Sequence, residues 1–315
     1  MPGLPLLGSR HRRVWAIPTT MNTTTNHSTE STSSTTTNRR EEKLAEARAV
    51  LEQGLSDVRE DPEALAAYLR FRSCFREYSV QNTMLIMLQR PTAQYCKGYR
   101  AWLQHGRQVR KGEKGLMIYA PILRRPTEEE IAGGADPDER IVSGFRVTHT
   151  FDYAQTDAVR DDALVYESPA PRLNREGYDG LAERLIATAA SIGYVVEELP
   201  QGLAGGGYAD GSCNFRTQTI KLAAGLSSAD RAAVLAHELA HAIAHGDGRK
   251  TGAVERELQA EGAAYVALNT LGLDTSRASL PYLKGWAGDD AALLSELAAI
   301  DRIATELLDR VDALS

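Results

Sequence analysis

The stretch His237-Glu238-Leu239-Ala240-His241 reads H-E-x-x-H and lies in an alanine- and leucine-rich run, residues 229–244, without Pro or Gly. Such a run predicts an α-helix. Residues i and i+4 of a helix lie one turn apart on the same face, so both imidazoles can reach one Zn²⁺ at about 2.0–2.1 Å. Glu238 can then act as general base for an attacking water. The motif therefore predicts a zinc centre.

An H-E-x-x-H stretch also arises by chance, and two helix histidines are often simply packed or exposed. The neighbouring residues oppose that interpretation, because Leu235, Leu239 and Ile243 are apolar and predict a buried helix. A buried Glu needs a partner. A metal centre would provide one.

A second candidate helix, residues 253–271, carries Glu257 and Glu261 one turn apart on one face. One carboxylate can complete a zinc site, and the other can accept the N–H of a ligand histidine. His245 is a competing ligand, but it lies on the same helix as His241 with no Gly between them to turn the chain. Glu255 is a weaker candidate.

This half of the chain resembles the gluzincin metallopeptidases, in which a Glu on a following helix completes H-E-x-x-H, often as E-x-x-A-D or E-x-x-A-E. The corresponding stretch here is Glu257-Leu258-Gln259-Ala260-Glu261. The resemblance implies a zinc-dependent peptidase in which His237, His241 and Glu257 hold Zn²⁺ and Glu261 orients a histidine. The reverse assignment of the two glutamates stays open.

Residues 22–38 are nearly all Thr, Ser and Asn. They bury too little apolar surface to offset the entropy of ordering, so residues 1–40 are expected to form a disordered tail. A first domain is expected over residues 41–160 and a second over residues 173–315, with a Pro-containing linker at 161–172. Both mix helical and strand-like patterns, which predicts the α+β class.

The cysteines and the apolar runs indicate in which cellular compartment the protein is expected. Cys74, Cys96 and Cys213 are odd in number and widely spaced, which argues against a disulfide framework and favours a reducing cytoplasm. No apolar run is long enough to span a membrane, so no membrane partner is expected.

The first domain is expected to combine helices with a small antiparallel sheet whose strands lie at residues 116–123 and 141–151. In the second domain, residues 214–222 are expected to edge the active cleft, where they can pair with an extended peptide. A last helix at 289–311 is expected to pack on the outside. Tyr208 and Tyr265 are candidate oxyanion donors.

The segment between Arg70 and Arg125 is strongly basic. It holds twelve Lys and Arg residues against two Glu, a net charge of +10, whereas the whole chain has −6, which leaves −16 for the rest. A basic segment in an acidic protein is typical of a phosphate-binding surface. The interleaved aromatic residues suit unstacked bases. Alternatively they belong to the core, the interpretation favoured for Trp102, or the basic face is simply solvated.

Several stretches here resemble the N-terminal domain of ArdC-type antirestriction proteins. They are Tyr78-Ser79-Val80-Gln81-Asn82-Thr83-Met84-Leu85-Ile86, Gln89-Arg90-Pro91-Thr92, Gly98-Tyr99-Arg100-Ala101-Trp102, the run G-R-Q-V-R-K-G-E-K-G at 106–115, and Phe151-Asp152-Tyr153-Ala154-Gln155-Thr156. In that family the domain binds single-stranded DNA and precedes a zincin-like metallopeptidase domain. The two resemblances together cover roughly residues 45–310, in the family's order.

Cations beside glycines in the 106–115 run can approach phosphates closely. Asn82 and Gln89 are candidates for base contacts, although they can equally cap or cross-link helices. The predicted DNA-binding residues are Arg76, Arg90, Lys97, Arg100, Arg107, Arg110, Lys111, Lys114, Tyr99 and Asn82.

Three functions remain open on the sequence alone. The first is an antirestriction-type, single-stranded-DNA-binding zinc peptidase of mobile genetic elements. The second is a non-enzymatic protein that protects single strands and holds a structural zinc, and the third is an accessory to conjugative DNA processing or priming. Glu238 favours the first, because a structural zinc needs no base. Expected partners are single-stranded DNA and a peptide or protein substrate, and the resemblance adds restriction enzymes.

Overall fold

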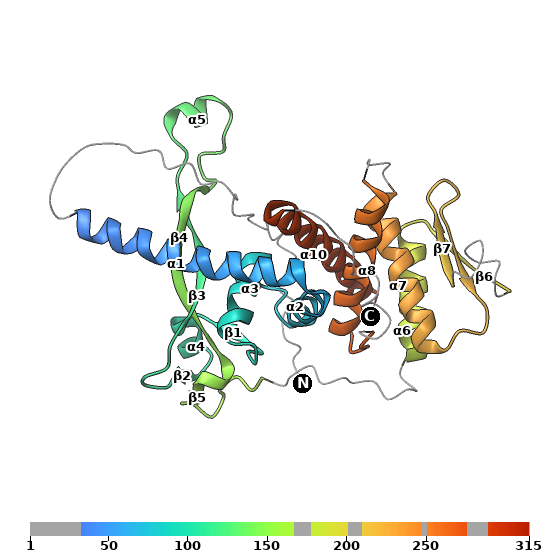
Figure 1. Ribbon diagram of the computed structural model, residues 1–315, viewed down its shortest axis with the longest axis horizontal. Coiled ribbons are helices and arrows are strands. Elements are labelled where there is room, and N and C mark those ends of the chain that lie inside the picture. The colour runs from blue at the N-terminus through green and yellow to red at the C-terminus, as the bar shows by residue number, and fades with distance from the viewer. Residues whose placement is uncertain (1–32, 167–177, 201–209, 247–250, 276–288, 315) are drawn as a thin grey trace.

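The computed structural model describes residues 33–166, 178–200, 210–246, 251–275 and 289–314. Figure 1 shows a long first helix and a projecting hairpin on one side, the helices of the H-E-x-x-H motif on the other, and the last helix between them. Helices and small sheets occur in both halves, which confirms the α+β class. Within the described ranges, no helix is long and apolar enough to cross a bilayer.

Three helices open the described chain: α1 (Ser33–Glu60), α2 (Pro62–Cys74) and α3 (Val80–Gln89). The Asp61 side chain accepts the Glu63 N–H, and Pro62 supplies the first helical residue of α2. The start of α1 at Ser33 corrects the expected tail, of which residues 1–32 lie outside the described chain. A helix formed by the Glu- and Ala-rich sequence after residue 40 extends at little cost, because propagation is easier than nucleation.

A long hairpin forms the N-terminal sheet. Strands β3 (Leu116–Arg124) and β4 (Ile141–Asp152) pair antiparallel, and β1 (Cys96–Lys97) pairs with the other side of β4. These strands confirm the two that the sequence predicted. Helix α5 (Glu128–Ala132) lies in the acidic connection. Helix α4 (Tyr99–Gln104), the 3-10 turn η1 (Tyr153–Gln155) and the short pair β2 (Arg107–Val109) and β5 (Thr156–Ala158) complete this half.

Two side-chain amides of α3 occupy the open edge of β3. Asn82 donates to the Tyr119 carbonyl at 2.9 Å and accepts the Tyr119 N–H at 2.8 Å. Gln89, two turns later, makes the same two bonds with Met117 at 3.0 and 2.8 Å. The helix thus covers an edge strand. Because both ends of the Asn82 amide are used in this pairing, the structure corrects the expectation that Asn82 contacts DNA.

The C-terminal half contains helix α6 (Tyr178–Ser191) and a second sheet. Its strands lie in the order β6 (Val195–Leu199), β8 (Thr219–Ala223), β7 (Gly211–Asn214), with β6 parallel and β7 antiparallel to β8. The edge strand beside Glu238 is therefore β7, with β6 at the opposite edge, which corrects the expected edge at 214–222. That stretch is interrupted by a turn in which the Asn214 side chain accepts the N–H of Arg216 and of Thr217, and Gln218 has a positive φ of 50°.

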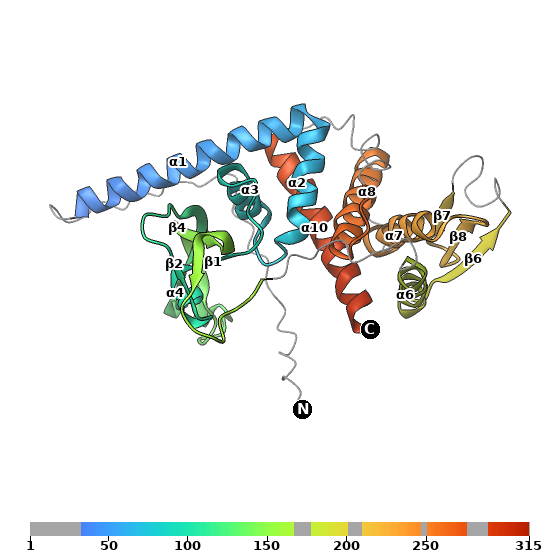
Figure 2. The same ribbon diagram turned by 90° about the horizontal axis from the view of Figure 1, so that it is seen from below.

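The last helix, α10 (Asp290–Ala313), lies between the two halves, as both views show (Figures 1 and 2). The expectation that it packs on the outside is wrong. Its buried residues, which include the consecutive Ala299, Ile300 and Asp301, cover more than one side of the helix. One hydrophobic core joins residues of α1, α2 and α3 with residues of α8 (Ala253–Thr270) and α10. The halves therefore share one continuous core.

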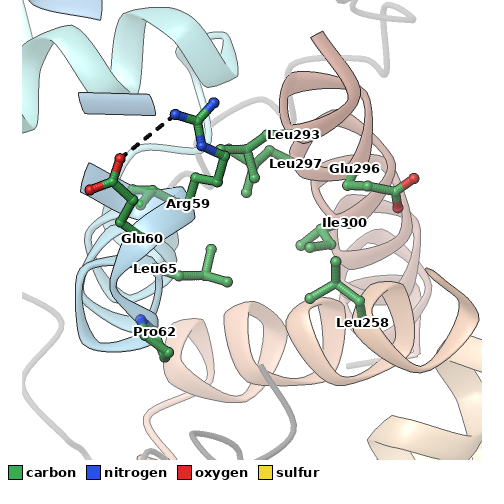
Figure 3. Close-up of a pocket in the computed structure, with 10 residues that line it drawn as sticks. Arg59, Glu60, Pro62, Leu65, Leu258, Leu293, Glu296, Leu297 and Ile300 are labelled. Atoms are coloured by element: carbon green, nitrogen blue, oxygen red, sulfur yellow. Dashed lines mark ion pairs between the residues drawn. The ribbon is translucent and has the colours of Figure 1, made fainter. Parts of the chain in front are cut away.

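A buried ion pair and a cavity mark this shared core. Arg72 of α2 is 2% exposed and donates from Nε to Asp301 of α10 at 2.7 Å. The same guanidinium donates to the Phe75 carbonyl and to Thr83 Oγ1 of α3. A cavity of about 130 Å³ lies nearby between α1, α2, α8 and α10, with Leu65 and Leu258 on its walls (Figure 3). The third candidate ligand, Glu257, directly precedes Leu258.

Candidate metal centre and nucleic-acid surface

Two helices carry the H-E-x-x-H motif and its acidic partners. Helix α7 (Ser228–His245) begins at Ser227, whose side chain accepts the Asp230 N–H. Leu235 and Leu239 of α7 are fully buried in the core that includes β8. Of the carboxylates on α8, Glu257 lies near both histidines, and Glu261, one turn later, lies near the first of them, His237. Helices α7 and α8 are therefore antiparallel at the motif.

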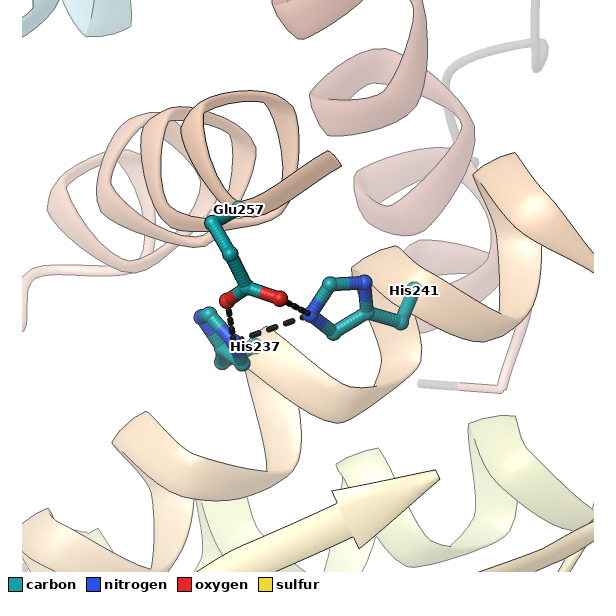
Figure 4. A group of neighbouring side chains, drawn as sticks. All are labelled: His237, His241 and Glu257. Atoms are coloured by element: carbon teal, nitrogen blue, oxygen red, sulfur yellow. Dashed lines mark hydrogen bonds and ion pairs between the residues drawn. The ribbon is translucent and has the colours of Figure 1, made fainter. Parts of the chain in front are cut away.

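The side chains of His237, His241 and Glu257 converge on one point (Figure 4). The two Nε2 atoms are 3.1 Å apart. Glu257 Oε2 lies 3.5 Å from His237 Nε2, and Glu257 Oε1 lies 3.5 Å from His241 Nε2. Two donors about 2.0–2.1 Å from a tetrahedral Zn²⁺ lie about 3.3–3.4 Å apart. The three separations fit that spacing, and two imidazoles with one carboxylate are a donor set that suits zinc.

Glu261 supports the first histidine from behind. Its Oε2 lies 3.0 Å from His237 Nδ1, the ring nitrogen that faces away from His241. Burial lowers the pKa of His237, but the carboxylates of Glu257 and Glu261 outweigh it and raise this pKa to about 10. Burial and the charge of His237 lower the pKa of His241 to about 4. The two carboxylates thus favour one positive charge on the pair of imidazoles. A metal ion between the two rings would supply positive charge at the same place.

Glu238 lies beside this cluster in the pocket wall. It is 7% exposed, and burial raises its pKa to about 7, partly offset by His237. Strand β7 passes very close to it: a Cβ at Gly211 would lie 2.4 Å from Val234 Cγ1 and 2.9 Å from Glu238 Oε1. Only glycine allows this approach. No sequence pattern had drawn attention to Gly211, because its neighbour Glu238 is distant in the chain.

The remaining candidates lie elsewhere. His245 is buried at the end of α7, its ring centroid 5.5 Å from that of His241, and it is not part of the converging group. Glu255 folds back on Gly252 at the start of α8. Tyr265 is fully buried in the shared core and does not line the pocket of the metal centre, so it cannot serve as an oxyanion donor. Tyr208 lies outside the described residues.

Half of the cations predicted to bind DNA are engaged within the fold. Arg107 is buried, donates to Thr156 and to the Leu164 carbonyl, and lies 4.1 Å from the centroid of the Tyr153 ring. This corrects the expectation that it faces phosphate. The other three pair with carboxylates: Arg76 with Asp309 and Asp312, Arg90 with Asp152, and Arg110 with Glu113 and Asp157.

The other four cations, Lys97, Arg100, Lys111 and Lys114, form no ion pair with any residue that the structure describes. Lys97 lies over the Tyr95 ring, 4.8 Å from its centroid. Tyr99 is 45% exposed and meets the Phe151 ring edge-on at 6.3 Å. Free cations and an exposed aromatic ring therefore occur on the same segment.

The sheet places these groups side by side. Lys97 of β1 pairs with Phe151 of β4, and a Cβ at Gly115 would meet the Phe151 ring from the other side at 3.0 Å. Lys114 precedes Gly115. Lys97, Phe151 and Gly115 therefore follow one another across the end of the sheet, with Tyr99 against Phe151 and the exposed Lys114 next to Gly115 in the chain. This surface, formed by Lys97, Tyr99, Lys114 and Phe151, is named the aromatic platform below.

Comparison with known proteins gives two domain matches. The N-terminal domain of anti-restriction factor ArdC matches residues 28–152, and the IrrE N-terminal-like domain of the peptidase M78 family matches residues 189–275. An uncharacterized Bacillus anthracis protein, pXO2-81, is 24% identical in an alignment 279 residues long, which covers 76% of this chain and 46% of that protein. The chain thus spans about half the length of this curated relative.

Solved structures of the antirestriction ArdC protein from plasmid R388 are also similar, at 19% identity. The Mn(II)-bound structure has a TM-score of 0.51 over 85% of this chain and 96% of that one, which indicates a shared fold. The metal-free structure has a TM-score of 0.48 over 74% and 84%.

Proposed function

Because the chain carries an ArdC-type N-terminal domain followed by an IrrE N-terminal-like domain of the peptidase M78 family, we propose that it is an antirestriction-type protein of mobile genetic elements that binds single-stranded DNA and cleaves peptide bonds with zinc. The observation that carries the enzymatic half is the convergence of His237, His241 and Glu257 beside Glu238. A purely structural site would not need an acid in that position.

His237, His241 and Glu257 would hold the ion, and Glu261 would orient His237 through Nδ1. When bound, the ion would polarise the substrate carbonyl and make a water more acidic. Zinc is preferred because two imidazoles and one carboxylate form a known catalytic set for it. The R388 relative binds Mn(II), so manganese is the alternative ion.

The chain's own residues supply the remaining chemistry. Glu238 accepts a proton from the attacking water and returns it to the leaving nitrogen. Burial of Glu238 keeps bulk water away from this transfer. Among the described strands, β7 pairs only with β8. Its other edge is therefore free to pair with an extended peptide, and Gly211 brings that edge against Glu238.

The proposal predicts that removal of the ion abolishes cleavage. Chelation should lower the rate of digestion of an unfolded protein such as casein by at least about 100-fold, since a catalytic ion contributes several kcal/mol. Addition of Zn²⁺ to the stripped protein should restore the rate, and mass spectrometry should find the same cleavage sites. Digestion that survives complete removal of metal would contradict the proposal. Absence of digestion in the zinc-loaded protein would favour the non-enzymatic alternative.

Single strands are proposed to bind on the aromatic platform and on the nearby cations Arg100 and Lys111. Bases can stack on an exposed ring while flanking cations contact the phosphates on either side. The supporting observation is that these cations, unlike Arg76, Arg90 and Arg110, are not neutralised by described carboxylates. Unpaired cations attract phosphate without first losing an internal partner.

Loss of the exposed ring should weaken DNA binding. Tyr99→Ala is expected to raise the Kd for a single-stranded oligonucleotide about 5- to 150-fold, the usual effect of one lost stacking contact. Tyr99→Phe keeps the ring and should bind as wild type does. Fluorescence anisotropy at fixed salt measures both, and Tyr99→Phe is the matched control. Equal Kd values for Tyr99→Ala and wild type would remove the platform from the binding surface.

A further inference from the structure

The pocket around the metal centre is long, and its two ends differ in chemistry. It encloses about 880 Å³. Because α7 and α8 run antiparallel, residues before His237 lie opposite residues after Glu261. One end is therefore lined by Val234 of α7 and by Ala264 and Leu268 of α8. The other end is lined by Arg256, one residue before Glu257. The metal-binding residues lie between the two ends.

The first end is apolar, with acids at its rim. Leu226 and Ala233 extend the aliphatic wall that Val234 and Leu268 form. Asp210 and Asp230 lie at this end, next to Gly211 and in the first turn of α7. An aliphatic side chain can be buried there. An anionic side chain would be repelled by the two aspartates.

The second end presents one free cation. Arg256 lines the pocket and is partly buried, yet its guanidinium makes no hydrogen bond or ion pair with any residue in the described ranges. Two other arginines near these helices have carboxylate partners: Arg231 pairs with Glu198 at 2.7 Å, and Arg70 pairs with Asp274 at 4.0 Å. A guanidinium fork held at a pocket wall without a partner is suited to bind a carboxylate through two parallel hydrogen bonds.

We propose that Arg256 selects the substrate: the pocket takes a peptide with a carboxylate on one side of the cleaved bond and an aliphatic side chain on the other. This inference rests on the proposed peptidase function. The carboxylate is a Glu or Asp side chain or the peptide's own C-terminus, since both present the same group. Glu257 and Glu261, the acids nearest Arg256 in the pocket, are committed to the histidines, so their charge is largely balanced when an ion is bound.

A peptide library digested by the zinc-loaded protein tests the selection. Mass spectrometry of the products should show Asp or Glu enriched about 10- to 100-fold at one fixed position near the cut, the range expected for a charge-assisted contact. Arg256→Gln should remove this enrichment, and Arg256→Glu should replace it with Lys or Arg. Arg231→Gln, which changes an arginine outside the pocket, should keep the wild-type pattern. A parallel library with amidated C-termini separates the two sources, because only C-terminal recognition is lost on amidation.

Binding provides a second readout that does not need cleavage. The Glu238→Gln protein loaded with Zn²⁺ should bind a synthetic peptide that contains one Glu and one Leu about 10- to 100-fold more tightly than the same peptide with Gln in place of Glu. Adding Arg256→Gln should abolish that difference. Cleavage with no preference for acidic residues, or the same preference in Arg256→Gln, overturns the assignment of Arg256 while the peptidase function stands. If no peptide is cleaved at all, the proposed peptidase function fails. If the protein also binds the Glu peptide and its Gln counterpart equally, the assignment of Arg256 as the carboxylate-binding residue is rejected as well.

Discussion

The Glu238→Gln protein is expected to cleave peptides with a kcat about 10²- to 10⁴-fold below that of wild type, the usual contribution of a general base. Gln has the same shape but cannot accept the proton. It fits the narrow space beside Gly211 and Val234, so the pocket should be preserved. Metal content measured by elemental analysis should equal that of wild type, because Glu238 is not among the converging donors.

Two controls distinguish this effect from a folding defect. Glu129→Gln, on α5 of the hairpin, removes an acid far from the pocket and should leave kcat unchanged. His241→Ala should lose both metal and cleavage. If Glu238→Gln retains the wild-type kcat, Glu238 is not the base, and the alternative of a structural zinc gains support.

The second large effect is expected on stability. Arg72→Met leaves the Asp301 carboxylate buried without its partner and should lower the free energy of unfolding by about 3–5 kcal/mol. It also removes the donors to the Phe75 carbonyl and to Thr83. Urea unfolding followed by circular dichroism measures the change. Both halves should unfold together, because one core joins them.

The comparison variants are Arg76→Met and the double change Arg72→Met with Asp301→Leu. Arg76 forms surface pairs with Asp309 and Asp312 on the same helix, and its loss should cost no more than about 1 kcal/mol. The double change removes both buried charges and should recover much of the lost stability. A cost for Arg72→Met no larger than for Arg76→Met would show that the buried pair does not hold α2 to α10.

The sequence was most informative where spacing along one helix decides geometry. His237 and His241, or Glu257 and Glu261, must share a helix face once each helix forms. The pairing of those two helices could not be derived from spacing, and here the gluzincin pattern supplied the expectation. The strands of the hairpin were also predicted, because alternation of apolar residues is local.

What the sequence did not reveal depends on partners distant in the chain. Arg107 and Asn82 look like DNA contacts in a basic segment, but Thr156 and Tyr119 engage them. The burial of α10 follows from apolar residues on several of its sides, a pattern that an outer helix does not need. Gly211 and Arg256 belong to no motif, and only the folded pocket reveals their positions.

The pairing of Arg72 with Asp301 has a consequence for synthesis, since the two residues are 229 positions apart. At about 5–20 residues per second, a ribosome adds that many residues in roughly 10–45 s. During this time α2 has emerged without the helix that neutralises its guanidinium and covers its apolar side. The nascent chain therefore exposes the apolar surface of α2 until α10 leaves the exit tunnel. Cotranslational chaperones should associate with the chain throughout that interval.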